Sequence, residues 1–166
     1  MNDIILRNMT SVYLIHGDKF LLLYRIGSRV ISDCYTGTAG GHFEKDELNE
    51  PKACILRELY EETGLTEKDI KNLSLRYISV RLKNNEIRQN YYYFADLDNE
   101  VELTSNEGKL RWVKFDEALS LKMPHSAKYV IKHYLEIGKD TDFLYCGAAA
   151  ESELIFTELK EFPDMR

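Results

Sequence analysis

The stretch AGGHFEKDELNEPKACILRELYEETGL, residues 39–65, decides how the rest of the chain is interpreted. Its second half predicts a helix over residues 50–63. Asn49 can cap the start of this helix, Pro51 is tolerated in its first turn, and Gly64 suits a left-handed cap at its end. A loop of glycine and acidic residues comes directly before this helix.

The predicted helix has two faces of different chemistry. At about 100° per residue, one stripe is suited to packing on a core and consists of Ile55, Leu56, Leu59, Tyr60 and Thr63. The opposite side gathers Glu58, Glu61 and Glu62. Each clash between these like charges and with the negative end of the helix dipole costs about 0.3–1 kcal/mol. A hard divalent cation would turn this cluster into a ligand set; a solvated acidic face is the alternative.

The segment before the helix favours the ligand interpretation. Residues 36–39 read as the end of a strand, and Gly40 and Gly41 then allow a tight turn in which a backbone carbonyl approaches a ligand. Glu44 and Glu47 follow in the loop. In this order of features the sequence resembles the Nudix box of the Nudix hydrolases, whose pattern is G-x5-E-x7-R-E-U-x-E-E-x-G-U, with U an apolar residue.

The match to this pattern has one departure. Gly41 and Glu47 fit the first spacing, and residues 57–65 (RELYEETGL) fit the second half without a break. Nine residues separate Glu47 from Arg57 where the pattern has seven. We place the two extra residues in the loop before the helix, so the departure concerns the roles of Glu44 and Glu47.

The resemblance implies a site that depends on Mg²⁺ or Mn²⁺. Glu58 and Glu62 would be the main metal ligands, and Glu61 would be a further ligand or would orient the attacking water. The carbonyl of Gly40 would complete the metal shell. The remaining box residues would support this arrangement, with Glu44 and Glu47 as outer ligands and Arg57 holding the cluster in shape.

Residues outside these positions are weaker candidates. Glu107 is the best choice for an additional carboxylate acting as base or ligand, ahead of Glu100 and Glu102. The candidates for binding substrate are Arg29 for phosphate, His42 for a glutamate or phosphate, and Tyr92 for stacking on a nucleobase. Each also has a plain interpretation, as solvated surface, a structural histidine or sheet packing.

Composition limits the classes of function. The 166 residues suit one domain over residues 1–166, with a tail, residues 142–166, of uncertain structure. A formal net charge of −6 argues against DNA or broad nucleic-acid binding and makes cations necessary for a polyphosphate substrate. Three widely spaced cysteines without a paired motif read as reduced thiols of a cytoplasmic protein. No apolar run suggests a signal peptide or a membrane partner.

Hydrophobic patterning predicts strands around the motif. One hairpin covers residues 10–16 and 20–25, a second covers 75–82 and 90–97, and a further strand covers 110–115. Asp116 can cap a short helix over 117–121, and an amphipathic helix over 127–137 has an apolar stripe that ends at Ile137. The pattern indicates the α/β class, and the resemblance implies a Nudix-type α/β/α sandwich with a mixed β-sheet between helices.

The function implied is metal-dependent hydrolysis of a diphosphate linkage in a nucleoside diphosphate linked to another group X, by a monomer or homodimer. Nudix enzymes for ADP-ribose often carry a proline near position 80, and those for diadenosine polyphosphates a tyrosine near position 82. This chain has Val80 and Leu82, so by elimination a nucleoside triphosphate or modified nucleotide is preferred. The alternatives are a nucleotide sensor without activity and an RNA 5′-end pyrophosphohydrolase.

Overall fold

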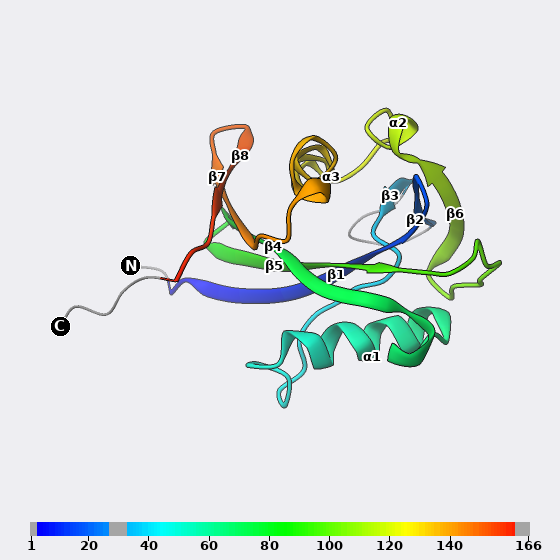
Figure 1. Ribbon diagram of the computed structural model, residues 1–166. Coiled ribbons are helices and arrows are strands. Elements are labelled where there is room, and N and C mark those ends of the chain that lie inside the picture. The colour runs from blue at the N-terminus through cyan, green and yellow to red at the C-terminus, as the bar shows by residue number, and fades with distance from the viewer. Residues whose placement is uncertain (1–2, 27–32, 162–166) are drawn as a thin grey trace.

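A computed structural model describes residues 3–26 and 33–161 of the chain. In these residues eight strands form one mixed sheet in the order β3-β2-β1-β5-β4-β7-β8, with β6 pairing β2 (Figure 1). The pairs β1–β5 and β4–β7 are parallel. The strands are β1 (Ile5–His16), β2 (Lys19–Arg25), β3 (Cys34–Thr36), β4 (Lys71–Lys83), β5 (Glu86–Asp96), β6 (Gly108–Lys114), β7 (Tyr145–Ala150) and β8 (Glu153–Glu158).

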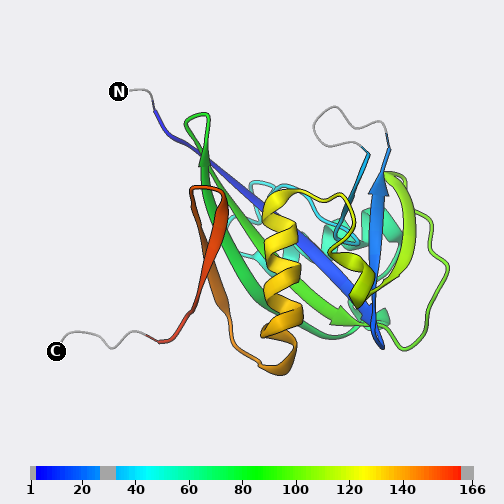
Figure 2. The same cartoon turned by 90° about the horizontal axis from the view of Figure 1, so that it is seen from above.

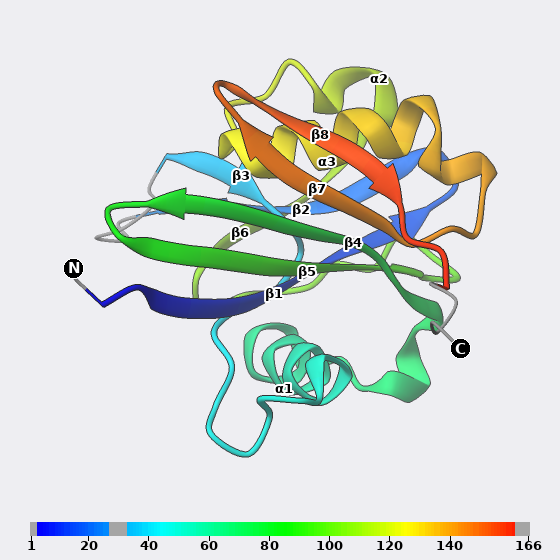
Figure 3. The same ribbon diagram turned by 90° about the vertical axis from the view of Figure 1, so that its left-hand side faces the viewer.

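Helices cover both faces of the sheet. Helix α1 (Pro51–Thr63) lies on one face, and α2 (Phe115–Ala118) and α3 (His125–Glu136) lie on the other (Figures 1 and 3). Short 3-10 turns follow α1 at Glu67–Asp69 and α3 at Gly138–Asp140. The expected α/β/α sandwich is therefore confirmed. No helix in the described ranges is long and apolar enough to cross a membrane.

Each face of the sheet has its own hydrophobic core because strand side chains alternate in direction. On β1, Val12 and Leu14 pack with Ile55 and Leu59 of α1. Tyr13 lies between them in sequence and packs on the opposite side, among Tyr92, Phe94, Val130, Ile131 and Tyr134. The central strands are thus anchored on both faces, which fixes the position of α1 over the sheet.

Helix α1 follows the expected bounds, with two corrections. Gly64 adopts a left-handed conformation, with φ of 76°, and donates its N–H to the carbonyl of Tyr60 at 2.8 Å. The expected Asn49 cap is wrong, because Glu50 holds the N-cap position and makes no side-chain cap bond. Tyr60 was expected on the core stripe but is 61% exposed, since the sheet covers a narrower stripe than the periodicity suggests.

The strands are longer than the hydrophobic runs that indicated them. In the second hairpin, β4 and β5 extend to a turn at Asn84 and Asn85, whose φ angles are 51° and 62°. Positive φ at both central residues is typical of two-residue hairpin turns. Charged residues occupy these strand ends, so the ends were not visible as apolar alternation.

The C-terminal half needs two corrections and resolves one open point. The short helix begins at Phe115, with Lys114 rather than Asp116 in the N-cap position. Helix α3 ends at Glu136, and Ile137 beyond it is 47% exposed rather than part of the packed stripe. Within the tail whose structure the sequence left uncertain, β7 and β8 form a hairpin that lies beside α3 (Figure 2, orange to red).

Candidate functional site

A cavity of about 570 Å³ opens where the segment after β3 crosses the sheet. It is bounded by α1, by the ends of β1, β2, β4 and β5, and by the start of α3. Several expected site residues lie on its wall: Gly40, Gly41, His42, Glu58, Glu62 and Glu107. The structure therefore brings together residues that are up to 67 positions apart in the sequence.

The two glycines allow a close approach between the segment after β3 and its neighbours. Thr10 donates its N–H to the carbonyl of Gly41 at 2.8 Å, so this segment runs beside β1. A Cβ atom at Gly40, whose φ is 155°, would lie 2.2 Å from the carbonyl oxygen of Thr10. A Cβ atom at Gly41 would lie 2.2 Å from Oε1 of Glu58. The position of the Glu58 carboxylate thus depends on glycine at position 41.

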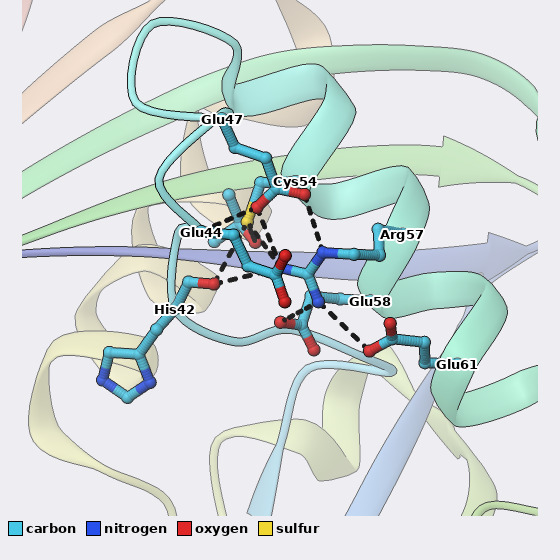
Figure 4. Close-up of polar contacts among 8 residues, drawn as sticks. His42, Glu44, Glu47, Cys54, Arg57, Glu58 and Glu61 are labelled. Carbon is cyan, nitrogen blue, oxygen red and sulfur yellow. Dashed lines mark hydrogen bonds and ion pairs between the residues drawn. The ribbon is translucent and has the colours of Figure 1, made fainter.

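Arg57 binds three acidic residues of the motif, Glu47, Glu58 and Glu61 (Figure 4). Its Nε and Nη2 donate to the two carboxylate oxygens of Glu47 at 2.7 and 2.9 Å. Its Nη1 donates to Glu58 at 2.9 Å and to Glu61 at 3.1 Å, and Nη2 also reaches the carbonyl of His42 at 3.1 Å. The hydrogen bonds from Arg57 lower the pKa of Glu47 to about 2 and, in return, raise that of the guanidinium.

The longer loop does not displace Glu47 from this network. Glu47 is 7% exposed, and its carboxylate also accepts the backbone N–H of Glu44 at 2.9 Å. Leu48, which follows, is 58% exposed, and Glu50 returns its N–H to the carbonyl of Glu47 at 2.8 Å. The extra length is therefore accommodated on the surface between Glu47 and the helix, while Glu44 borders the cavity.

Glu62 is a second buried carboxylate of the motif. It is 7% exposed, and burial, with a further contribution from the charge of Glu58, raises its pKa to about 7. A backbone hydrogen bond from Gly40 acts in the opposite direction. No ion pair neutralises Glu62 among the residues that the structure describes. Two neighbouring carboxylates of this kind need a positive charge between them to be ionised at low cost.

The donor set fits a hard divalent cation that shares its coordination with substrate. Glu58 and Glu62 both line the cavity, whereas the side chain of Glu61 is 54% exposed and lies outside its wall. Within residues 3–26 and 33–161, no group of three or more Asp, Glu, His or Cys side chains is arranged so that it could hold a metal ion by itself. The guanidinium of Arg57 lies between the carboxylates of Glu47, Glu58 and Glu61. Mg²⁺ is commonly held by one or two carboxylates together with substrate phosphates, which is what this wall offers.

Glu107 lines the same cavity. Its carboxylate forms an ion pair with Arg25 at the end of β2, and both residues line the cavity. Glu100, the second candidate, instead pairs with Lys19 on the surface. Arg25 was not singled out from the sequence, although its Nε is buried without a partner among the described groups. Its position at the end of an apolar strand did not indicate a functional role.

The expected substrate-binding residues differ in their surroundings. His42 borders the cavity with Nε2 at 3.2 Å from Nη1 of Arg7, and burial together with Arg7 lowers its pKa. Tyr92 lies on the cavity floor, 1% exposed and stacked on Tyr13 with ring centroids 6.4 Å apart. Arg29 lies outside the described residues.

Four further polar residues of the cavity were not found from the sequence. They lie on the three central strands and are Arg7, Arg81, Arg88 and Asn90. Their side chains come together through the register of β1, β5 and β4. Strand register is not visible in one sequence, so only the polar character of alternate positions could have indicated them.

Comparisons with known proteins agree with this geometry. A family model described as the NUDIX domain matches residues 6–134. The crystal structure of a mutator MutT protein from Bacillus halodurans is similar, with a TM-score of 0.63 and 28% identity over 92% of this chain and 97% of that one. The solution structure of the E. coli ORF135 protein has a TM-score of 0.66 at 18% identity, covering 84% and 95% of the two chains. A C. elegans Ap4A hydrolase in a binary complex has a TM-score of 0.63 at 15% identity, covering 82% and 99%.

Proposed function

The chain belongs to the Nudix family, and from this premise we propose that it hydrolyses a diphosphate linkage in a nucleoside diphosphate linked to another group X. The observation that carries the proposal is the pairing of Glu58 and Glu62 on the wall of one cavity, directly beside the Gly40–Gly41 segment. A binding protein has no need of a buried carboxylate held so close to a second one. A cation-dependent hydrolase does need such a pair.

The residues of the chain have distinct parts in this reaction. Glu58 and Glu62 hold Mg²⁺ or Mn²⁺, with the carbonyl of Gly40 as a further donor. The cation, when bound, neutralises phosphate charge and acidifies water for attack at phosphorus. Arg57 keeps Glu58 oriented through the 2.9 Å hydrogen bond. It also contacts Glu61, whose side chain is exposed at the edge of the cluster.

Further side chains complete the proposed site. Glu107, oriented by Arg25, presents a carboxylate to the cavity and is the candidate base for the attacking water. Glu47 supports the cluster through Arg57 rather than through the cavity. His42, which lies next to Arg7, would hydrogen-bond a phosphate oxygen. Catalysis then rests mainly on positioning and on electrostatic stabilisation.

For the substrate we propose a nucleoside triphosphate or a modified nucleotide. The Bacillus halodurans structure, a mutator MutT protein, is the most similar in sequence of the three described and covers almost all of this chain. The Ap4A hydrolase neighbour makes dinucleoside polyphosphates a necessary part of any test, but at 15% identity it informs the fold.

A substrate panel with and without metal tests this function. Release of phosphate, pyrophosphate and nucleotide would be measured for nucleoside triphosphates including 8-oxo-dGTP, for dinucleoside polyphosphates, for nucleotide sugars and for ADP-ribose. We expect turnover of at least one class with Mg²⁺ or Mn²⁺ and none with excess EDTA. Specific nucleotide binding without turnover across the panel would instead establish a sensor, and turnover confined to triphosphorylated RNA would establish a 5′-end pyrophosphohydrolase.

A further inference from the structure

Three arginines form a row across the central strands on the face that carries α3. Arg7 of β1 is paired in register with Arg88 of β5, and Arg88 is paired with Arg81 of β4. Residues paired in this way point to the same side of a sheet. All three line the 570 Å³ cavity that also contains Glu58 and Glu62. The row therefore belongs to the wall that a substrate would meet.

Internal ion pairs neutralise only part of this row. The carboxylate of Glu86 accepts from Arg7 and, at 2.6 Å, from Nε of Arg88. Arg81 has no ion pair and no side-chain hydrogen bond with any residue in the described ranges. The three guanidinium groups of the row thus share one ion-pairing carboxylate, that of Glu86, in a protein whose formal net charge is −6. Support of the β4–β5 hairpin explains the contacts of Arg7 and Arg88 but leaves Arg81 without a role.

The row leads away from the proposed metal site. At its near end, Nη1 of Arg7 lies 3.2 Å from Nε2 of His42, which follows Gly41. Arg88 and Arg81 lie one and two strands farther, at about 4.8 Å per strand. The backbone of Arg81 is therefore about 10 Å beyond that of Arg7, at the end of the row away from His42 and the Gly40–Gly41 segment.

A further polar residue of the wall, Asn90, lies two positions after Arg88 on β5. Asn90 of β5 is paired with Met9 of β1 and Ser79 of β4, and its Nδ2 is 3.3 Å from the hydroxyl of Ser11. Its Oδ1 is buried and has no partner among the described groups. An unpaired buried acceptor is costly unless a ligand or water supplies a donor. The wall therefore offers an acceptor for a hydroxyl or amine beside the arginines.

We propose that this row binds a phosphate monoester that the substrate carries at a distance from the diphosphate that is cleaved, with Arg81 as its main anchor. The inference rests on the proposed function for the placement of the diphosphate. A guanidinium is always charged and matches two oxygens of a phosphate. Asn90 then accepts from the sugar or base next to that phosphate. Among the substrates proposed above, the wall therefore selects modified nucleotides that carry such a second phosphate, because an unmodified nucleoside triphosphate has no phosphate apart from its triphosphate chain.

Matched ligand pairs test the proposal without hydrolysis. Binding of NADPH and NADH, and of coenzyme A and dephospho-coenzyme A, would be measured by calorimetry in EDTA and again in CaCl2, because a divalent cation neutralises the diphosphate that all four ligands share. The members of each pair differ by one phosphate monoester. We expect the phosphorylated member to bind about tenfold more tightly, as for a charged hydrogen bond, and Arg81→Gln to reduce this preference to about twofold or less.

Lys83→Gln is the matched control, because Lys83 lies two residues along β4, is exposed and does not line the cavity. We expect it to keep the full preference, which separates the contact made by Arg81 from a general effect of positive charge. Equal binding within both pairs, no measurable binding, or an unchanged preference in Arg81→Gln would overturn the proposal. Preference without hydrolysis of any substrate would overturn the proposed function alone and leave the phosphate site in place.

Discussion

At the scale of single side chains, Arg57 determines the shape of the acidic cluster. It forms a fork with both oxygens of Glu47 and also binds Glu58 and Glu61. Its own side chain is 23% exposed and that of Glu47 is 9% exposed, so these contacts are only weakly screened by solvent. The same residue therefore stabilises the fold and orients a carboxylate of the cavity.

Replacing Arg57 with lysine tests the fork. The charge is kept, but a single ammonium group cannot bind both oxygens of Glu47 and the other glutamates at once. We expect the free energy of unfolding to fall by about 1–3 kcal/mol in urea titrations. Arg111→Lys is the control, since Arg111 is exposed and lies 3.4 Å from the hydroxyl of Tyr35. Equal losses in the two variants would contradict this account.

The pKa of Glu47 predicts how stability depends on acid. The hydrogen bonds from Arg57 lower it from an ordinary 4.5 to about 2 in the folded protein. A lowered carboxylate pKa stabilises the fold above the unfolded value, and this stabilisation is lost as the pH falls through the folded value. The stability advantage of the wild type over Glu47→Gln should therefore be full above pH 4.5 and shrink toward pH 2. A difference that is constant across this window would show that Glu47 keeps its ordinary pKa.

The motif residues could be recognised from the sequence because they are close together in it. Spacing alone placed Glu58 and Glu62 on one side of a helix, and the structure puts both on the cavity wall. The arginines of the wall could not be recognised in this way. Arg7 and Arg88 are 81 positions apart and meet only through the parallel register of β1 and β5.

At the scale of secondary structure, the site depends on how closely the Gly40–Gly41 segment lies between β1 and α1.

Helix α1 was predicted to within one residue, because Pro51 and Gly64 mark its ends by backbone geometry. The strand ends were less visible, since charged side chains occupy the hairpin at Asn84 and Asn85. Helix α2 was misplaced because Phe115 continues an apolar strand pattern into the helix.

Gly41→Ala tests the close approach of the segment to α1. The added methyl group would lie 2.2 Å from Oε1 of Glu58, so the carboxylate has to turn away from its position on the cavity wall. We expect turnover to fall at least about tenfold, with little change in stability because a long side chain can move. Gly17→Ala in the β1–β2 turn, where φ is 58°, should show the opposite pattern, a loss of about 1 kcal/mol with turnover intact. Unchanged turnover in Gly41→Ala would refute the role of this contact.

At the scale of the whole molecule, the mixed sheet places the acidic helix and the arginine row on two sides of one cavity. The class of fold followed from the order of strands and helices and from the motif. The strand order did not follow from the sequence. Strand β1 lies between β2, its neighbour in the chain, and β5, which is distant in the chain. Such pairings of high sequence separation are decided by packing of the complete chain.

Cation binding should be visible in the stability of the intact protein. A ligand that binds only the folded state at 100 times its dissociation constant stabilises it by about 2.7 kcal/mol. We therefore expect MgCl2 or MnCl2 to raise the melting temperature of the wild type, and to raise that of Glu62→Gln much less. NaCl at the same ionic strength is the control for screening of the glutamates. An equal rise with NaCl would show that screening, and not binding, is responsible.

The most direct test of the central claim is hydrolysis by the wild type and by Glu62→Gln, side by side, with and without Mg²⁺ or Mn²⁺. The amide keeps the size of the side chain and removes the charge that binds the cation. The account predicts metal-dependent release of nucleotide by the wild type, and at least about a hundredfold slower release by a folded Glu62→Gln protein. Equal turnover in the two proteins, or turnover that persists in EDTA, would contradict the assignment of the cavity as a metal-dependent hydrolase site.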